Sequence, residues 1–403
     1  MTNEVTQKTT SDEQNVSSSN GLEPKIRFKC FNENWHPTTI GNVFTFINGK
    51  AHEQNVVEFG NYIIVNSKFI STDGEVKKYS DAQICPLYKG DIVMVMSDVP
   101  NGKAMSKCLL INSDDRYTLN QRICALRTKY TPLFYMLQIS RNDYFMRFDD
   151  GVKQTNLRKD DVLGCPLFET SLPEQEKIAA FLSLVDARIE KQRQLVEALK
   201  KYKRGLFLKL YGNFEKKSYK ISDLGKYCAT GTLSKDDIDV SGEYQCILYG
   251  ELFTKYGETI SQVISRTNVT PTYLSGSNEI LFPSSTTADA LSLIFPSSLK
   301  IKNIFLGGDL FTIKLKNEFD SDFISYLINF VYKNTFARYA QGITIIHLHY
   351  TDIKEQIIDI PDIVIQLKIS DIMKKIEAII ENNDNELKSL LLMKKGFLQQ
   401  MFI

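Results

Sequence analysis

The sequence predicts an α+β fold in which one unit, a mixed domain followed by a long helix, occurs twice. Three observations predict it. The middle of the chain carries an apolar stripe with heptad spacing, the same stripe returns 191 residues later, and short matched segments precede both stripes. We therefore expect two mixed α/β domains separated by two long helices that pack as an antiparallel coiled coil, with an internal pseudo-twofold repeat.

The segment from Ser171 to Leu208 predicts a long, highly charged helix. Its apolar residues recur at alternating steps of four and three, which is typical of a narrow coiled-coil seam. Ser171, Pro173 and Glu174 predict the helix start, through an N-cap, a first-turn proline and a capping box. About 38 residues at about 1.5 Å each give a helix roughly 57 Å long. The seam is Ile178, Leu182, Val185, Ile189, Gln192, Val196, Leu199, Lys203, Leu206 and Leu210.

A second helix with the same seam follows at an offset of 191 residues. Its polar interruptions coincide with those of the first, because Asn383 matches Gln192 and Lys394 matches Lys203. A glycine also returns at the same offset, although glycine costs about 1 kcal/mol inside a helix. The second seam is Ile369, Met373, Ile376, Ile380, Asn383, Leu387, Leu390, Lys394, Phe397 and Met401.

The repeat extends into the domains that precede the helices. "TNLRKDDV" matches "IHLHYTDI" at an offset of 191, "GDIVMVMSDV" matches "NEILFPSSTT" at 188, and "TIGNV" matches "DLGKY" at 184. The polar first residues indicate a flexible tail. The expected divisions are a tail at 1–24, a first domain at 25–165, a central helix at 166–212, a second domain at 213–359 and a C-terminal helix at 360–403.

The two seams favour pairing of the helices with each other. The predicted interface consists of the apolar seam residues from Ile178 to Leu206 and from Ile369 to Phe397. The alternative is that each helix packs on its own domain. A helix of this length extends beyond a domain of about 140 residues, whose radius of gyration is about 14 Å, so we expect inter-helix pairing.

The composition indicates a globular protein with free thiols and without a membrane span. A chain of 403 residues with 43% hydrophobic residues can form two or more cores. Its seven cysteines include no C-x-x-C pair, and no signal peptide is recognisable, which favours free thiols in a reducing cytoplasm. No apolar run approaches the length of about 18 residues that a membrane span needs, so we expect no membrane partner.

Local charge is more informative than the net charge of +1. Between Gln121 and Lys159 there are eight basic residues and three acidic ones. Such a run is either a solvated face or part of a nucleic-acid footprint, and the run alone does not decide between them.

The central helix begins with a recognisable motif. "LPEQEKIAAFLSLVDARIEKQRQLVEALKKYKRGLFLKLY", with its weaker copy at the C-terminus, resembles the specificity subunit of type I restriction–modification systems. "PKIRF", "NW", "TIGNVFTFINGK" and "KGDIVMVMS" in the first domain support the resemblance. The second copy, "IPDIVIQLKISDIM", keeps Gln366, Lys368 and Ile369 but lacks the Glu-Gln pair of the first.

The resemblance implies a function and a set of partners. Each domain would be a target-recognition domain that reads one half of an asymmetric bipartite site on double-stranded DNA. The helix pair would set the spacer length and dock two methyltransferase subunits, with restriction subunits joining for cleavage. S-adenosylmethionine, ATP and Mg would then belong to the partner subunits, and this cytoplasmic chain would hold no cofactor.

We find no catalytic motif in the chain. There is no phosphate-binding G-x-x-x-x-G-K-[ST] loop, no [DNS]-P-P-[YF] tetrapeptide for amino methylation and no F-x-G-x-G. Asp362 with Glu386 and Lys388 mimics a nuclease pattern but is spread along one predicted helix. The spacing of His347 and His349 would place both on one face of a strand, but no thiol or carboxylate cluster accompanies them, so we expect a polar loop or strand end rather than a metal site.

Three kinds of segment are candidates for DNA contact. They are the polar loops after the matched strands, the glycine turns before the helices and the early loops "NGK" and "TGT". Each could also be a simple turn. Lysines would anchor phosphates, and arginines would contact bases or phosphates. The candidate residues are Lys50, Asn101, Lys103, Lys107, Lys153, Arg158, Ser284, Ser285, Thr286, Arg338 and His347.

Two other functions are weighed against DNA specificity. A coiled-coil scaffold that joins two proteins and does not bind DNA explains the helices equally well, but not the basic run or the paired loops. A single-chain methyltransferase–nuclease is disfavoured because its motifs are missing.

Overall fold

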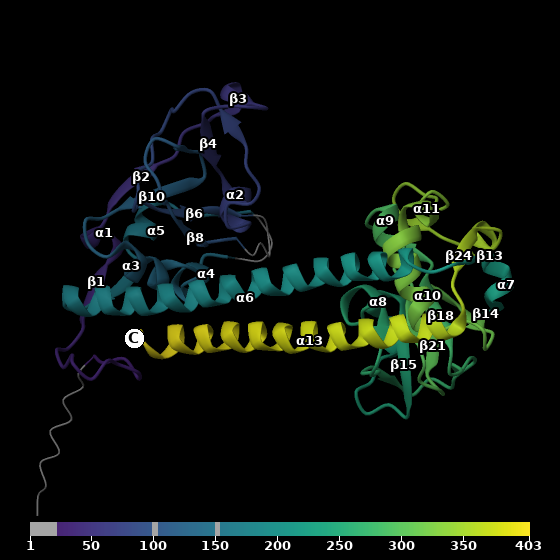
Figure 1. Cartoon of the computed structure of the whole chain (residues 1–403). Helices are drawn as coiled ribbons and strands as arrows, with labels where there is room; N and C mark the ends of the chain where they lie inside the picture. Colours follow the sequence, from purple (N-terminus) through teal and green to yellow (C-terminus); the bar gives the residue numbers. More distant parts are fainter. Residues whose placement is uncertain (1–21, 99–103, 150–153) are drawn as a thin grey trace, which may run out of the picture. The chain divides into compact units, whose positions relative to one another are not determined.

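The computed structural model describes residues 22–98, 104–149 and 154–403. The chain divides into two units, each of which is described by itself. The first unit comprises the chain up to Glu190 together with Lys388–Ile403, and the second comprises Lys191–Leu387. Two long helices, α6 (Leu172–Gly212) and α13 (Ile363–Gln400), therefore contribute residues to both units (Figure 1).

The first unit combines short strands with short helices. Its helices besides the long ones are α1 (Ile40–Val43), α2 (Ser67–Ser71), α3 (Pro132–Ile139), α4 (Asp143–Met146) and α5 (Lys159–Leu163). Its strands are β1 (His36–Thr39), β2 (Thr45–Asn48), β3 (Val56–Val57), β4 (Tyr62–Val65), β5 (Tyr79–Ser80), β6 (Ile92–Val95), β7 (Ser97–Asp98), β8 (Cys108–Leu110), β9 (Tyr117–Leu119), β10 (Ile123–Arg127), β11 (Thr155–Asn156) and β12 (Pro166–Glu169).

The second unit has a similar order of elements, with α9 added between β19 and β20. Its shorter helices are α7 (Ile221–Leu224), α8 (Tyr249–Thr254), α9 (Ala290–Leu293), α10 (Ser321–Leu327), α11 (Lys333–Ala337) and α12 (Tyr350–Ile353). Its strands are β13 (Lys217–Lys220), β14 (Gly225–Ala229), β15 (Tyr244–Leu248), β16 (Thr259–Ile260), β17 (Arg266–Thr267), β18 (Glu279–Pro283), β19 (Ser285–Thr286), β20 (Ser297–Leu299), β21 (Phe305–Gly307), β22 (Leu310–Leu315), β23 (Ile346–His347) and β24 (Ile357–Ile360).

Sheet topology confirms the internal repeat. The main antiparallel sheet has the order β2-β10-β6-β8 in the first unit, and β14-β22-β18-β20 in the second, where β16 adds a fifth strand. The pairs β1–β12 and β7–β11 match β13–β24 and β19–β23, and the parallel pair β4–β9 matches β15–β21. The predicted offset of 188 holds for β6 and β7, and that of 191 holds for β11 and β12. The offset of 184 is wrong, because α1 matches α7 at 181: Gly41 lies inside α1, whereas Gly225 begins β14.

The long helices pack side by side and antiparallel within each unit. In the first unit, the rings of Phe181 and Phe397 lie 5.0 Å apart, and Asp186 pairs with Lys394 at 2.5 Å. In the second unit, Gln192 contacts Asn383 at 2.9 Å, and Lys203 pairs with Glu377 at 3.1 Å. In both units the residue number rises along α6 as it falls along α13, which confirms the predicted antiparallel arrangement (Figure 1).

The seam residues face the interior. Every apolar residue of the predicted interface, from Ile178 to Leu206 and from Ile369 to Phe397, is buried or partly buried. The helix ends also join the domain cores. Ile178 and Leu182 pack with Phe397 and Met401 in the core of the first unit. The two alternatives predicted for the long helices, pairing with each other and packing on the domains, therefore both occur.

The core of the second unit contains a residue outside the predicted seam. Phe207 of α6 is fully buried beside the aromatic rings of Phe323, Tyr326 and Phe330. The neighbouring seam residue Leu206 is only partly buried. The heptad seam thus gives way to a core-facing stripe near the end of α6, because the helix there packs on the domain of the second unit.

Two sequence expectations at the start of α6 need correction. The predicted division at 166 is too early, because residues 166–169 form β12 and pair with β1, whereas α6 begins at Leu172, directly after the predicted N-cap Ser171. Glu174 does not act chiefly in a capping box. Its buried carboxylate accepts hydrogen bonds from Arg27 at 2.7 and 2.8 Å and from the hydroxyl of Thr170. This ion pair fixes the start of α6 to the N-terminal part of the first unit.

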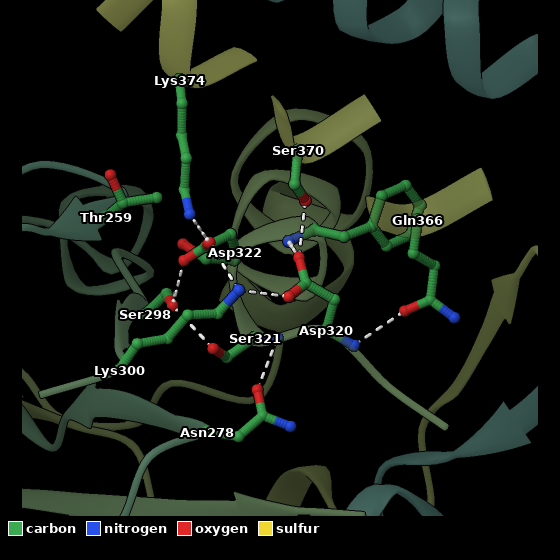
Figure 2. A network of polar contacts seen from close by, with 12 residues as sticks. Thr259, Asn278, Ser298, Lys300, Asp320, Ser321, Asp322, Gln366, Ser370 and Lys374 are labelled. Atoms are coloured by element: carbon green, nitrogen blue, oxygen red, sulfur yellow. Dashed lines mark hydrogen bonds and ion pairs between the residues drawn. The ribbon is translucent and has the colours of Figure 1, made fainter. Parts of the chain in front are cut away.

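The start of α13 is attached to the second unit by a buried polar network, shown in Figure 2. Asp322 binds the ammonium groups of Lys300 and Lys374 at 2.7 and 2.6 Å. Asp320 pairs with Lys300 and accepts a hydrogen bond of 2.6 Å from Ser370 on α13. Two buried carboxylates thus face two lysines, so the charges in the network balance.

This network predicts acid sensitivity of the second unit. Burial opposes ionisation of Asp322, but hydrogen bonds from Lys300, Lys374 and Ser298 outweigh it and lower the pKa of its carboxyl. A carboxyl with a lowered folded pKa contributes stability that is present above its unfolded pKa of about 3.9 and lost as the pH falls through the folded value. We expect the free energy of unfolding, measured by urea titration, to fall below about pH 4.

The Asp322→Asn variant should be less stable near neutral pH, and its stability should depend less on pH below about 4. Asp371→Asn is the matched control, because Asp371 forms an exposed pair with Lys375 on the same helix. A pH profile of the Asp322→Asn variant that parallels the wild type would contradict this assignment.

No helix within the described ranges is both long and apolar enough to cross a membrane.

Candidate nucleic-acid interface

Three loops of the first unit meet at one edge of its main sheet. The antiparallel register places Asn48, at the end of β2, opposite Cys124 near the start of β10. It also places Val95, at the end of β6, opposite Ile123. The loops that follow β2 and β6 and the turn that precedes β10 therefore share this edge, which we call the loop edge.

The loop that holds Lys50 is fixed by close backbone contacts. The ring of His52 is buried and donates from Nδ1 to the carbonyl of Lys50 at 2.7 Å, while Nε2 accepts from the hydroxyl of Thr118 at 2.8 Å. A side chain at Gly49 would lie 1.9 Å from the carbonyl oxygen of Asn120, so only glycine fits there. The exposed side chain of Lys50 is thus carried by a rigid loop.

The second unit has an equivalent loop edge. Its register pairs Ala229, at the end of β14, with Phe311 and pairs Pro283, at the end of β18, with Leu310. The predicted early loop at residues 230–232 and the polar loop after β18 therefore lie beside the turn before β22. Together they line a polar pocket of about 530 Å³.

Short strand pairs bring the segments before the long helices to the same edges. In the first unit, Ser97 of β7 pairs with Asn156 of β11, and its hydroxyl donates to the Asn156 side chain at 2.6 Å. In the second unit, Ser285 of β19 pairs with His347 of β23. All three kinds of candidate segment therefore converge within each unit, although they are far apart in the sequence.

Hydrogen bonds fix the carboxylates of the second loop edge. The buried hydroxyl of Ser285 donates to Asp309 at 3.0 Å. The backbone N–H and the hydroxyl of Ser234 both donate to Asp237 at 2.7 Å, and these bonds lower the pKa of Asp237. Both carboxylates face the pocket and can accept further hydrogen bonds from a ligand.

Comparison with known protein families decides the identity of this arrangement. A family model described as the type I restriction modification DNA specificity domain matches the chain twice, at residues 32–201 and 213–391. The chain belongs to this family. The two matches coincide with the two copies of the repeat, so each loop edge belongs to one specificity domain.

Solved structures support the fold of the specificity domains. The chain is similar to the S subunit of a type I restriction–modification system from M. genitalium, with 18% identity and a TM-score of 0.59, covering 95% of this chain and 99% of that chain. It is also similar to a chain from a structure describing complex assembly and conformational transition of the type I R-M system, with 13% identity and a TM-score of 0.53, covering 91% and 97% of the two chains. Curated protein sequences give no match.

The candidate residues of the first specificity domain differ in whether their side chains are free to contact DNA. Arg158 is exposed at the start of α5, two residues after β11. Lys107 borders the loop edge beside Val95, but its ammonium group is held by Asp73 and by the carbonyl of Ser71, both at 3.0 Å. The candidates Asn101, Lys103 and Lys153 lie outside the described residues.

In the second specificity domain, Ser284, Ser285 and Thr286 lie at the loop edge as the repeat predicts. His347 is exposed there, and its ring stacks on that of His349 with centroids 6.1 Å apart. Arg338 is exposed at the C-terminal end of α11.

Sequence reasoning did not propose Arg122 or Asp309, the exposed residues immediately before β10 and β22. Arg122 belongs to the basic run between Gln121 and Lys159, but the run does not single it out. No motif marks Asp309, and only the structural repeat places both residues at the loop edges. The alignment of "GDIVMVMSDV" with "NEILFPSSTT" gives an offset of 188 residues. Arg122 and Asp309 are 187 residues apart, so this alignment does not match them with each other.

Proposed function

We propose that the chain is the DNA specificity subunit of a type I restriction–modification enzyme. Each specificity domain reads one half of a bipartite site, and the helix pair sets the length of the unread spacer. The observation that carries this proposal is the pair of equivalent loop edges in a chain of this family. The chain supplies sequence recognition, and catalysis lies in partner subunits.

The two half-sites should differ. The loop edges have the same backbone arrangement but carry different side chains. Asn156 in the first domain corresponds to His347 in the second, because their strand partners Ser97 and Ser285 correspond. Sequence is read by side chains that reach base edges, so one scaffold with two sets of side chains favours an asymmetric site.

Exposed apolar residues on the long helices support docking of methyltransferase subunits. Leu184 on α6 and Leu392 on α13 are 72% and 71% exposed, and Tyr202 is also exposed. Contiguous exposed apolar residues mark partner contacts, and Leu391 and Met393 are exposed on either side of Leu392. We propose two methyltransferase subunits per chain, restriction subunits that join for cleavage, and action on DNA in the cytoplasm.

Reconstitution tests the function directly. The full chain, mixed with its methyltransferase subunits and S-adenosylmethionine, should methylate one bipartite sequence in a random DNA library, as read by methylation sequencing. Binding of that DNA should weaken steeply with salt, with log K falling by about 0.9 per phosphate contact for each unit of log salt.

The result also separates the proposal from a scaffold that does not bind DNA. An assembled complex that shows no salt-dependent binding of DNA and methylates no defined sequence would contradict the proposed function and favour the scaffold. A heat-denatured chain with the same methyltransferase subunits is the control for background methylation.

A further inference from the structure

Arg122 and Asp309 occupy equivalent positions in the two specificity domains. Each residue immediately precedes an inner strand of its sheet, β10 or β22. The carbonyl of Arg122 accepts a hydrogen bond of 3.0 Å from the N–H of Met96, and the carbonyl of Asp309 accepts one of 2.8 Å from the N–H of Ser284. Met96 and Ser284 are themselves equivalent, since each directly follows the strand paired with β10 or β22.

Both turns present their side chains outward. Arg122 has a φ of 67°, in the left-handed region, and in the second domain this region is taken by Gly308, the neighbour of Asp309, with a φ of 81°. Left-handed backbone at a non-glycine residue is uncommon, and it clusters at functional sites. The side chains of Arg122 and Asp309 are exposed at the loop edges, and they carry opposite charges.

A carboxylate at a DNA-facing edge has few partners. It repels phosphate, and it accepts hydrogen bonds but cannot donate them. In the major groove, the donors are the N4 amino group of cytosine and the N6 amino group of adenine. Adenine also presents the acceptor N7 beside its amino group, which disfavours a carboxylate, so cytosine is the better partner for Asp309.

The surroundings of Asp309 fit this role. Its Oδ2 atom accepts from the buried hydroxyl of Ser285, which fixes the orientation of the carboxylate. None of the residues that line the adjacent pocket, all of which the structure describes, is Lys or Arg. The pocket therefore favours a donor group of a base over a phosphate.

Arginine in the equivalent place has the opposite preference. Its guanidinium donates to two acceptors at once, and guanine presents O6 and N7 side by side in the major groove. We propose that Arg122 and Asp309 read a base at corresponding positions of the two half-sites, guanine for Arg122 and cytosine for Asp309. This inference rests on the proposed function and deepens it. It implies a G·C pair in each half-site, in opposite orientations.

Substitutions at Asp309 test the cytosine assignment in the full chain assembled with its methyltransferase subunits. Methylation of a library with both half-sites randomised is read by sequencing. Asp309→Ala should lower discrimination at one position of one half-site by tenfold or more. Asp309→Asn should shift the preference at that position from cytosine to adenine, because asparagine pairs with N6 and N7 of adenine.

The matched control for Asp309→Asn is Glu318→Gln, which removes a charge from an exposed residue beyond the other end of β22. It should leave both half-sites unchanged. Retained preference for cytosine in Asp309→Asn, or equal strengthening on all sequences through loss of repulsion, would overturn the assignment. The other half-site serves as an internal control for folding and assembly.

Arg122→Ala should relax discrimination at one position of the other half-site, with Lys129→Ala beyond the far end of β10 as the control. A uniform loss of affinity on all sequences, with the slope of log K against log salt reduced by about one, would identify a phosphate contact and overturn the guanine assignment.

If the wild-type complex methylates no defined sequence, the proposed function fails. If it does so and both variants keep its preferences, only this inference fails.

Discussion

A heptad inserted into each long helix, one after Gln192 and one after Asn383, is expected to abolish methylation of the native site and to restore it at sites with a longer spacer. Gln192 Nε2 donates to the backbone and side-chain oxygens of Asn383 at 3.0 and 2.9 Å, so these residues face each other. Seven added residues preserve the alternating steps of the seam. They lengthen each helix by about 10 Å, which corresponds to about three base pairs of B-DNA.

The measurement is methylation sequencing of a library that varies the spacer between fixed half-sites. Methylation at the native spacing should fall by at least tenfold, and both half-sites should stay the same. A single insertion in α6 alone is the matched control, because it moves the seam of one helix past the other and should reduce methylation at every spacing. Altered half-sites with an unchanged spacer would show that the helices do not set the spacing.

The Lys203→Met variant is expected to destabilise the second unit strongly. The Lys203 ammonium is buried and pairs with Glu258 at 2.8 Å and with Glu377 at 3.1 Å. Burial disfavours its charge, but the attraction of the two carboxylates outweighs burial and raises the pKa of Lys203. Methionine would leave two poorly solvated carboxylates without a cation. Breaking a buried pair from one side costs about 3–5 kcal/mol, and the partial exposure of the glutamates reduces this to about 2–4.

The internal repeat supplies the control for this variant. Lys394 occupies the equivalent seam position, but its pair with Asp186 is more exposed, so Lys394→Met should cost about 0–1 kcal/mol. Amide hydrogen exchange under urea measures each change in the unit that holds the pair, which is the second unit for Lys203→Met and the first unit for Lys394→Met. Equal effects of the two substitutions would contradict the role of burial. The double variant Lys203→Met with Glu377→Gln should recover part of the loss, because it removes one of the unpaired charges.

The long-range organisation could be predicted from the sequence because it is written in periodic patterns. A heptad stripe repeats the same physical requirement over many residues, so the two helices and their antiparallel pairing follow from it. The stripe also recurs with its polar interruptions, Gln192 with Asn383 and Lys203 with Lys394, and each of these residues meets the opposite helix. Duplication of the domains was visible for the same reason.

The details of the loop edges could not be predicted. The strand pairs β7–β11 and β19–β23 contain only two residues per strand and join segments that are far apart in sequence, so they leave no periodic signal. Arg122 and Asp309 differ in charge and share no motif. Lys107 was chosen for its charge, but its ion pair with Asp73 depends on the packing of α2, which sequence does not reveal. The capping box predicted for Glu174 rests on local spacing alone. Its actual partner, Arg27, is 147 residues away in the sequence, so no local pattern indicates the ion pair.

The contribution of residues 388–403 to the first unit has a consequence for biosynthesis. Met401 lies in the hydrophobic core that also contains Trp35 and Phe134, and the ring of Phe402 contacts both of these aromatic side chains. On the ribosome, the N-terminal half of the chain emerges about 200 residues before the segment that completes its core. At 5–20 residues per second, that half waits roughly 10–40 s with an open apolar surface. Nascent chains stalled near residue 387 should therefore recruit chaperones, and release of the remaining segment should end that dependence.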